Sequence, residues 1–342
     1  LLVRSRQLFD GRPWRAAPNL VSDFRVDIRP RGRPRSDTDP ATAFDGLAGA
    51  AGLNGTQRAV WLAVSEAARG FRLRRFQVDA ARRLLEGWGE HGTIVTAGTG
   101  SGKTIAFYLP ALVAMSDGLT AADHWVRALC IYPRQELLKD QFSEALRLAK
   151  LASATLRGAG RREFSLGALY SGTPRSATPE ELGRAGWRRV PTGFVCPFLR
   201  CTVCGGDLVW KDGDVSGGRE LLRCSSPACD NVLGDDHVRL TRASILRQPP
   251  DLLFTTTEML NQRLSDTRFR ALFGIGKPKA KRPLFVLLDE VHTYSGTSGA
   301  QAALLLRRWR HMLDSPVRWV GLSATLREAS AFFADLTGLR PD

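Results

Sequence analysis

A glycine-rich loop is the first feature of the sequence with evident chemical potential. It reads AGTGSGKT and comprises Ala97, Gly98, Thr99, Gly100, Ser101, Gly102, Lys103 and Thr104. Glycines at alternate positions let backbone N–H groups close around phosphate oxygens. The loop follows an apolar strand-like run and opens a helix, which is the setting of a nucleotide-binding loop. We therefore expect Lys103 to reach the β- and γ-phosphates of ATP and Thr104 to bind Mg²⁺. The alternative is a glycine-rich loop with a chance lysine.

A pair of carboxylates follows the apolar run LFVLL at residues 284–288. Two carboxylates at the tip of a core strand are costly unless they have a partner, and a magnesium nucleotide supplies one. We expect Asp289 to hold Mg²⁺, directly or through water, and Glu290 to orient and deprotonate the attacking water. An acidic surface turn after a strand is the alternative.

The cysteines are concentrated in one segment, with five of the six between Cys196 and Cys229. Cys201 and Cys204 enclose two residues and precede two glycines, as in a zinc knuckle, and Cys224 and Cys229 follow after a gap of nineteen residues. We expect these four thiolates to hold a structural Zn²⁺. The four residues between the second pair are wider than usual, so Cys196 is an alternative ligand. Scattered buried cysteines and an iron–sulfur cluster are the other interpretations.

Short apolar strands alternating with helices must position these groups. The expected strands cover residues 93–96, 128–132, 166–170, 252–255, 284–288 and 318–322, and the expected helices cover 53–70, 76–87, 103–115, 135–150, 258–264 and 300–313. This alternation predicts an α/β fold with a parallel sheet covered on both faces. Ligands of such sheets bind at the carboxyl ends of the strands.

The domain organisation follows from where the alternation holds and where it stops. Residues 1–52 are rich in Arg and Pro and predict an irregular arm. Residues 53–174 predict the first part of a nucleotide-binding domain with N-terminal helices, and residues 251–342 predict its remainder. Residues 175–250 lack the alternation and hold the cysteines, so we interpret them as an inserted zinc module.

The composition favours a polyanionic partner. The formal charge is +15, and 42 of the 49 basic residues are arginine. A chain this basic favours nucleic acid first and an anionic membrane surface second, although a GC-rich genome would also raise the arginine content. The sequence has neither a span of about 18 apolar residues nor a signal peptide in its first 15 residues. We therefore expect a cytoplasmic protein with reduced thiols and no membrane partner.

Together these motifs resemble the superfamily 2 helicases of the DExH type, P-loop NTPases with a RecA-like fold. Asp289, Glu290, Val291 and His292 match the second motif of that family. The predicted catalytic residues are therefore Glu290, Asp289 and His292, together with Lys103 of the phosphate loop. Ser323, Ala324 and Thr325 match the third motif, which couples hydrolysis to movement. Gln77, in a Phe-Gln pair upstream of the loop, stands where the family reads adenine.

The resemblance also indicates nucleic-acid contacts, at residues that follow three of the expected strands. They are Pro133, Arg134, Gly172, Thr256 and Thr257. The DEVHTYSG segment at residues 289–296 is similar to bacterial helicases of the mitomycin-repair type and of DISARM-like phage-defence systems.

Only 17 residues follow Thr325, so we expect a fragment without the second RecA-like domain and its arginine finger. The resemblance implies an ATP-dependent DNA helicase, with poor activity for this chain alone. An RNA helicase and a non-catalytic nucleic-acid-binding module are the alternatives.

Overall fold

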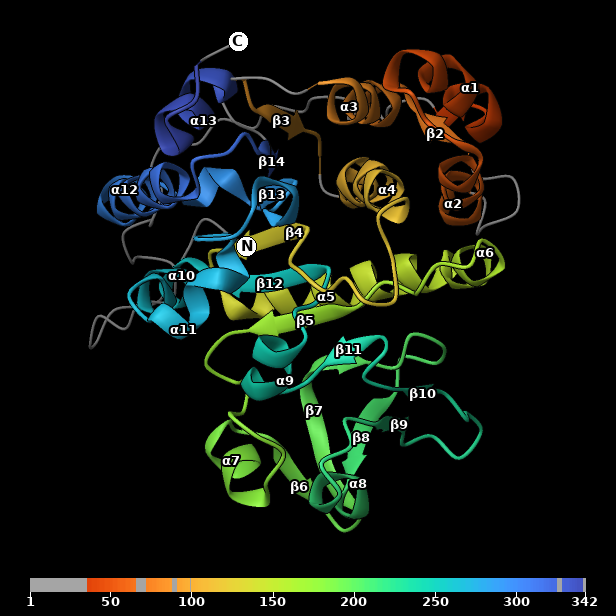
Figure 1. Ribbon diagram of the computed structural model, residues 1–342, viewed down its shortest axis with the longest axis vertical. Coiled ribbons are helices and arrows are strands. Elements are labelled where there is room, and N and C mark those ends of the chain that lie inside the picture. Colours follow the sequence, from red (N-terminus) through yellow and green to blue (C-terminus); the bar gives the residue numbers. More distant parts are fainter. Residues whose placement is uncertain (1–35, 66–71, 88–90, 99, 325–327, 341–342) are drawn as a thin grey trace, which may run out of the picture. The chain divides into compact units, whose positions relative to one another are not determined.

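The computed structural model describes residues 36–65, 72–87, 91–98, 100–324 and 328–340. A seven-stranded parallel sheet lies at the centre of the chain (Figure 1), with the strand order β11-β5-β12-β4-β13-β14-β3. In that order the strands are Val238–Arg239, Leu166–Leu169, Leu252–Thr256, Ala128–Tyr132, Phe285–Leu288, Arg318–Ser323 and Thr93–Thr96. All six sequence-predicted strands are therefore present, and β11 is an additional short strand at the edge.

Helices cover both faces of this sheet, as the sequence predicts. On one side, α3 (Arg75–Glu86), α4 (Lys103–Ser116) and α5 (Gln135–Leu151) contact the strands, and α1 (Pro40–Ala51), α2 (Gly55–Ser65) and α6 (Ser153–Gly158) pack against these helices. The other face packs against α9 (Arg242–Arg247), α10 (Thr257–Leu264), α11 (Thr267–Arg270), α12 (Gly296–Leu313) and α13 (Ala329–Thr337). Short 3₁₀ segments occupy Ala271–Phe273, Lys279–Lys281 and Val291–Thr293.

Strand β4 shows why both faces are covered. Cys130 and Tyr132 belong to the first core and Leu129 and Ile131 to the second, because successive side chains of a strand point to opposite faces.

The expectation of an irregular segment up to residue 52 is wrong for residues 40–51, which form α1. Asp39 caps this helix by accepting a 3.1 Å hydrogen bond from the N–H of Thr42, and Pro40 fits its first turn. Phe44 is buried and makes an edge contact of 5.9 Å with the ring of Trp61. Tertiary packing against α2 thus stabilises a helix that its glycines obscure in the sequence. Residues 1–35 of the expected arm lie outside the described residues.

The inserted module contains a second, antiparallel sheet, with the order β10-β9-β8-β7-β6. Its strands in chain order are Arg188–Val190, Gly193–Arg200, Asp207–Lys211, Leu222–Cys224 and Val232–Leu233, and it also has two short helices, α7 (Pro179–Arg184) and α8 (Asp212–Ser216). The module was expected to extend to residue 250, but the elements near that limit belong to the main sheet. Strand β11 pairs with β5 of the main sheet, and α9 packs on the main sheet's second face.

A buried ion-pair cluster ties the amino ends of the central strands together. Asp251 is fully buried and accepts hydrogen bonds from Arg127 at 2.5 Å and from Arg162 at 2.6 and 2.8 Å. It also accepts the backbone N–H of Ser165 at 2.9 Å. One carboxylate thus joins residues next to β4, β5 and β12, at the edge opposite the predicted sites.

Two further strands, β1 (Ser36–Thr38) and β2 (Leu73–Arg74), pair in antiparallel fashion before α3. None of the helices among the described residues is long and apolar enough to span a lipid bilayer.

Candidate nucleotide and nucleic-acid sites

The predicted functional residues fall on one edge of the main sheet because all its strands are parallel. The segments after β3, β13 and β14 carry the predicted nucleotide and coupling residues, and these strands are neighbours in the sheet. The segments after β4, β12 and β5 carry the predicted nucleic-acid residues, and these strands are also neighbours. The strand order therefore divides one edge into two adjoining halves, which the linear order of the motifs does not reveal. We call the part after β3, β13 and β14 the nucleotide half, and the part after β4, β12 and β5, where a nucleic-acid strand is expected, the strand half.

The phosphate loop has a conformation that requires glycine. Gly100 and Gly102 have φ angles of 74° and 84°, which L-residues with a side chain rarely adopt. The N–H of Ser101 donates to the carbonyl of Gly98 at 3.2 Å, and the buried Oγ of Ser101 has no hydrogen-bond partner among the described residues. A buried hydroxyl without a partner fits a site built for a polar ligand.

The ends of the loop are anchored to secondary structure. The N–H of Ala97 donates to the carbonyl of Ser323 at 3.2 Å, and Lys103 and Thr104 open α4. Exposed backbone N–H groups at such a helix start favour an anion. Thr99 lies outside the described residues.

Gln77 lies directly against the phosphate loop. Its Nε2 donates to the carbonyl of Gly102 at 3.0 Å, and its Oε1 accepts the backbone N–H of Arg74 at 2.9 Å. The Arg74 guanidinium in turn donates to the carbonyl of Ser101 at 2.5 Å. Sequence reasoning missed Arg74, although its position three residues before Gln77 was a usable signal.

The two acidic residues after β13 differ in their surroundings. Asp289 is buried, and burial raises the pKa of its carboxyl to about 6, with a smaller contribution from the charge of Glu290. The backbone N–H of Glu290 donates to Asp289 Oδ1 at 2.8 Å, and this bond and the charge of Lys103 oppose the rise. Glu290 has a φ angle of 48°. A buried carboxylate facing a lysine, with a second carboxylate beside it, fits a site for a divalent cation.

His292 brings the second and third motifs together. Its Nδ1 lies 3.3 Å from a carboxylate oxygen of Glu290 and 3.2 Å from the Oγ of Ser323. Ser323 is fully buried at the end of β14, and Ala324 follows it. Thr325 lies outside the described residues. The structure thus joins one predicted coupling residue, Ser323, through His292 to the predicted hydrolytic residue Glu290.

A cleft of about 820 Å³ opens over the phosphate loop. Its lining includes residues 100–105 of the loop and α4, Glu290, and Arg72, Arg74 and Gln77 from the α3 side. Helix α5 contributes Gln141, Glu144 and Arg147, which sequence reasoning did not assign to this site. The volume is in the range of small-molecule sites.

The predicted nucleic-acid residues occupy the neighbouring half of the edge. Pro133 and the exposed Arg134 connect β4 to α5. Thr256 ends β12 and caps α10 by accepting the N–H of Met259 at 3.2 Å, and Thr257 is the first residue of α10. These positions leave backbone N–H groups at the start of α10 facing the edge, where phosphates bind favourably.

Gly172 joins the strand half of this edge to the inserted module. Its carbonyl accepts a 3.1 Å hydrogen bond from the indole N–H of Trp187, which directly precedes β6. The ring of Phe198 in β7 packs against Trp187, Tyr170 and Phe142 at 5.9, 5.8 and 5.5 Å. The module is therefore fastened to the loop that carries Gly172.

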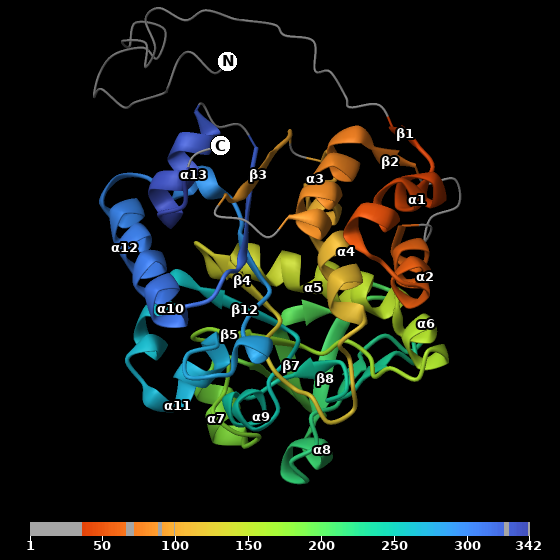
Figure 2. The ribbon, with the colours of Figure 1, turned by 45° about the horizontal axis from the view of Figure 1, so that its top comes forward.

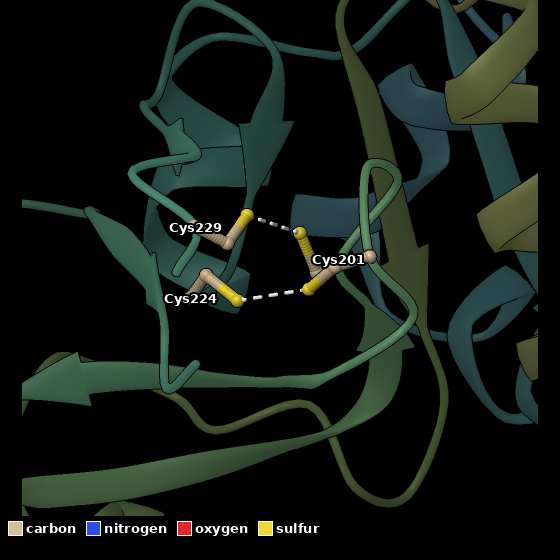
Figure 3. Close-up of side chains that lie close together, drawn as sticks. Cys201, Cys224 and Cys229 are labelled. Atoms are coloured by element: carbon tan, nitrogen blue, oxygen red, sulfur yellow. Dashed lines mark hydrogen bonds between the residues drawn. The ribbon is translucent and has the colours of Figure 1, made fainter. Parts of the chain in front are cut away.

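The four predicted cysteine ligands lie together in the module (Figure 3). Their sulfur atoms all lie within 4.8 Å of one another, with Cys201 Sγ 3.7 Å from Cys229 Sγ and Cys204 Sγ 3.3 Å from Cys224 Sγ. A tetrahedral Zn²⁺ with Zn–S bonds of about 2.3 Å separates its sulfurs by about 3.8 Å, whereas a disulfide joins them at about 2.05 Å. The donor set fits zinc.

Backbone and side-chain donors surround these sulfurs. Although burial opposes it, the backbone N–H groups of Cys204 and Val203 and the side chain of Asn231 lower the pKa of Cys201 to about 6. Asn231 donates to Cys201 Sγ at 3.2 Å, which is the kind of second contact that holds a metal-binding thiolate. Cys196 is buried and does not belong to the cluster, and burial raises the pKa of its thiol to about 12.

Comparison with known proteins identifies the family. Residues 74–188 and 219–332 match the model of the DEAD/DEAH box helicase family. The chain belongs to this family. The gap between the two matched segments, residues 189–218, falls within the inserted module, so this part of the module lies outside the family match.

Two curated relatives share parts of the sequence. The Druantia protein DruE of Escherichia coli (strain UMEA 4076-1) is 28% identical over 299 residues, which covers 72% of this chain and 16% of that protein. The Lhr helicase/uracil glycosylase of Escherichia coli (strain K12) is 39% identical over 101 residues, covering 29% of this chain and 6% of that protein. The chain thus spans less than a fifth of the length of either relative.

Solved structures confirm the helicase RecA-like fold. The DUF1998 helicase MrfA bound to DNA and AMPPNP aligns with a TM-score of 0.51 at 19% identity, covering 90% of this chain and 30% of that chain. The helicase Lhr of Mycobacterium smegmatis bound to ssDNA and AMP-PNP aligns with a TM-score of 0.52 at 22% identity, covering 84% of this chain and 26% of that chain. These likenesses and the family match together bear out the expected superfamily 2 resemblance.

Proposed function

We propose that this chain is the nucleotide-binding motor domain of an ATP-dependent DNA helicase or translocase. The observation that carries the proposal is the division of one sheet edge into a nucleotide half and a strand half, joined by β13 and β4 as neighbours in the sheet. DNA is favoured over RNA because MrfA and Lhr, which align over most of this chain, are bound to DNA in their structures. A DEAD-box helicase bound to ssRNA also aligns, so RNA is an outcome that the test must distinguish.

The nucleotide half divides the work between charge and geometry. The loop amides and Lys103 would hold the phosphates, and Thr104 and Asp289 would hold Mg²⁺, which when bound would supply positive charge beside the phosphates. Glu290 orients the attacking water and accepts its proton, and His292 holds the Glu290 carboxylate beside Ser323. Gln77 keeps the loop in its binding shape through Gly102, in addition to the adenine contact that its position predicts.

The strand half binds the phosphodiester backbone, so that affinity depends on charge rather than on sequence. Arg134 and the start of α10 supply the phosphate contacts. We propose that the cysteine-bound Zn²⁺ stabilises the module and, through Trp187, the Gly172 loop. We also propose that a second RecA-like domain completes the motor in the intact enzyme, as the greater length of the relatives suggests.

The test compares the wild-type chain with two variants in the same nucleotide-binding assay. Lys103→Ala should abolish ATP binding, because it removes the cation that faces the phosphates. Glu290→Gln should keep binding and, in the intact enzyme, stop turnover. ATP binding by Lys103→Ala at wild-type affinity would contradict the assignment.

Competition between single-stranded DNA and RNA of equal length then decides the substrate, with DNA preference expected. A preference for RNA would favour the RNA helicase. Failure to bind either would leave a nucleotide-binding domain without a strand path.

A further inference from the structure

A groove of about 610 Å³ lies between α10 and α12. It begins at Thr257, the first residue of α10, and at Ser298, in the first turn of α12. Helix α10 follows β12 and α12 follows β13, so both helices start at the edge of the sheet that carries the proposed sites. In Figures 1 and 2, α10 and α12 lie on the side of the sheet away from α1 and α2. The groove is therefore continuous with the strand half of the edge.

The wall formed by α12 is suited to an anionic backbone. The helix has 18 residues and no Asp or Glu among them. Its exposed side chains at helical spacing include Gln301, Leu304, Arg308 and His311. Ser298, Gln301 and Arg308 line the groove and offer hydroxyl, amide and guanidinium donors. Such donors bind phosphate oxygens without regard to sequence.

The wall formed by α10 differs in a way that sets the orientation of a strand. Asn261 accepts a 2.9 Å hydrogen bond from Arg308 across the groove, which holds the guanidinium in place. Glu258 is the carboxylate among the groove-lining residues and accepts a hydrogen bond from Gln262 at 3.2 Å. Its negative charge disfavours phosphates on the groove wall of α10, beyond the backbone N–H groups at the start of that helix, and tolerates base amino groups there. Leu304, with 70% of its surface exposed, adds an apolar contact for a base or sugar on the α12 side.

We propose that this groove extends the nucleic-acid path beyond Thr257, with the phosphates along α12 and the bases toward α10. The inference rests on the strand path of the proposed function and adds a second segment to it. Ser298 and Arg308 are ten residues apart, about 15 Å along a helix. A stacked strand crosses that distance in about four nucleotides.

The experiment measures anisotropy of fluorescein-labelled oligo(dT) strands of two lengths. The short strand is the shortest one whose affinity falls in Arg134→Ala, and the long strand has about five nucleotides more. Arg308→Ala should leave the short strand unchanged and weaken the long strand about three- to tenfold, with its salt slope reduced by about 0.7. Arg308→Glu should weaken the long strand further, and Arg58→Ala on α2 is the matched control that should change neither.

Three outcomes would count against the inference. Equal affinity of wild type, Arg308→Ala and Arg308→Glu for the long strand would overturn it and leave the groove to a protein partner. An equal loss for both strands would show a general charge effect and also overturn it. Arg134→Ala could leave the affinity unchanged at every length while Arg308→Ala still lowers it for long strands. That result would contradict the strand path of the proposed function and would still support nucleic acid as the occupant of the groove.

Discussion

Two glycines of the phosphate loop allow backbone strain to be separated from steric conflict. Gly102 has a φ angle of 84°, and a Cβ added there would lie 2.6 Å from Nε2 of Gln77. Gly100 has a φ angle of 74°, but a Cβ there would have no atom of the other described residues, its chain neighbours aside, within 4 Å. Gly100→Ala therefore adds strain alone, whereas Gly102→Ala adds strain and displaces the Gln77 amide.

The magnitudes follow from these contacts. Placing alanine in the left-handed region costs about 1–2 kcal/mol, and both variants share this cost. In Gly102→Ala the displaced amide also loses its hydrogen bond to the carbonyl of residue 102, worth about 0.5–1.5 kcal/mol. We expect Gly100→Ala to lower the free energy of unfolding by about 1–2 kcal/mol and Gly102→Ala by about 1.5–3.5 kcal/mol.

The assay is urea denaturation of the nucleotide-free chain, with Gln77→Ala and the double variant Gln77→Ala/Gly102→Ala included. Once the Gln77 side chain is gone, the additional cost of Gly102→Ala should shrink to that of Gly100→Ala. The nucleotide affinity of Gly102→Ala should also fall, because binding must first return the loop to its nucleotide-binding conformation. Each 1.4 kcal/mol that this costs lowers the affinity about tenfold. If Gly102→Ala costs the same with and without Gln77, the reasoning that Gln77 holds the loop is refuted.

Three further predictions concern metal, pH and the core. The chain should contain one zinc per molecule by elemental analysis; Cys201→Ser should lose it and Cys196→Ser should keep it, whereas the reverse pattern would show a different ligand set. The hydrogen bond that the His237 imidazole donates to Asp236 raises the pKa of His237, with the charge of Glu163 adding to it. This stabilisation is therefore fully present below about pH 6.5 and is lost as pH rises through the higher folded value. Melting temperatures of His237→Gln should therefore converge with wild type at alkaline pH, and a constant difference at every pH would contradict this. Asp251→Asn should lower the free energy of unfolding by about 3–5 kcal/mol, because it leaves the buried Arg127 and the partly buried Arg162 without their counter-ion; a loss below about 1 kcal/mol in urea denaturation would exclude that role.

Local sequence was sufficient for the features whose chemistry depends on neighbours along the chain. The phosphate loop, the Asp289–Glu290 pair and the Cys201–Cys204 knuckle are short runs in which residue type and spacing define the chemistry. The buried strands could also be predicted from the sequence, because fully buried parallel strands are continuous apolar runs. The family match agrees with these motifs.

Long-range packing decided what the sequence could not. Helix α1 is stabilised by the contact of Phe44 with Trp61, and β11 exists because it pairs with β5. Gln77 lies against Gly102, and Trp187 holds Gly172, through hydrogen bonds that span 25 and 15 residues. No local pattern records such a partner.

The division of the site into a nucleotide half and a strand half is also a tertiary property. Sequence alone predicted that both sets of residues follow strands, but the order β5-β12-β4-β13-β14-β3 decides which sets are neighbours. The physical reason is that hydrogen bonding between parallel strands is indifferent to side-chain identity, so strand order is set by how the two helical layers pack. That packing depends on the shapes of many distant side chains at once, whereas each motif depends on a few adjacent ones.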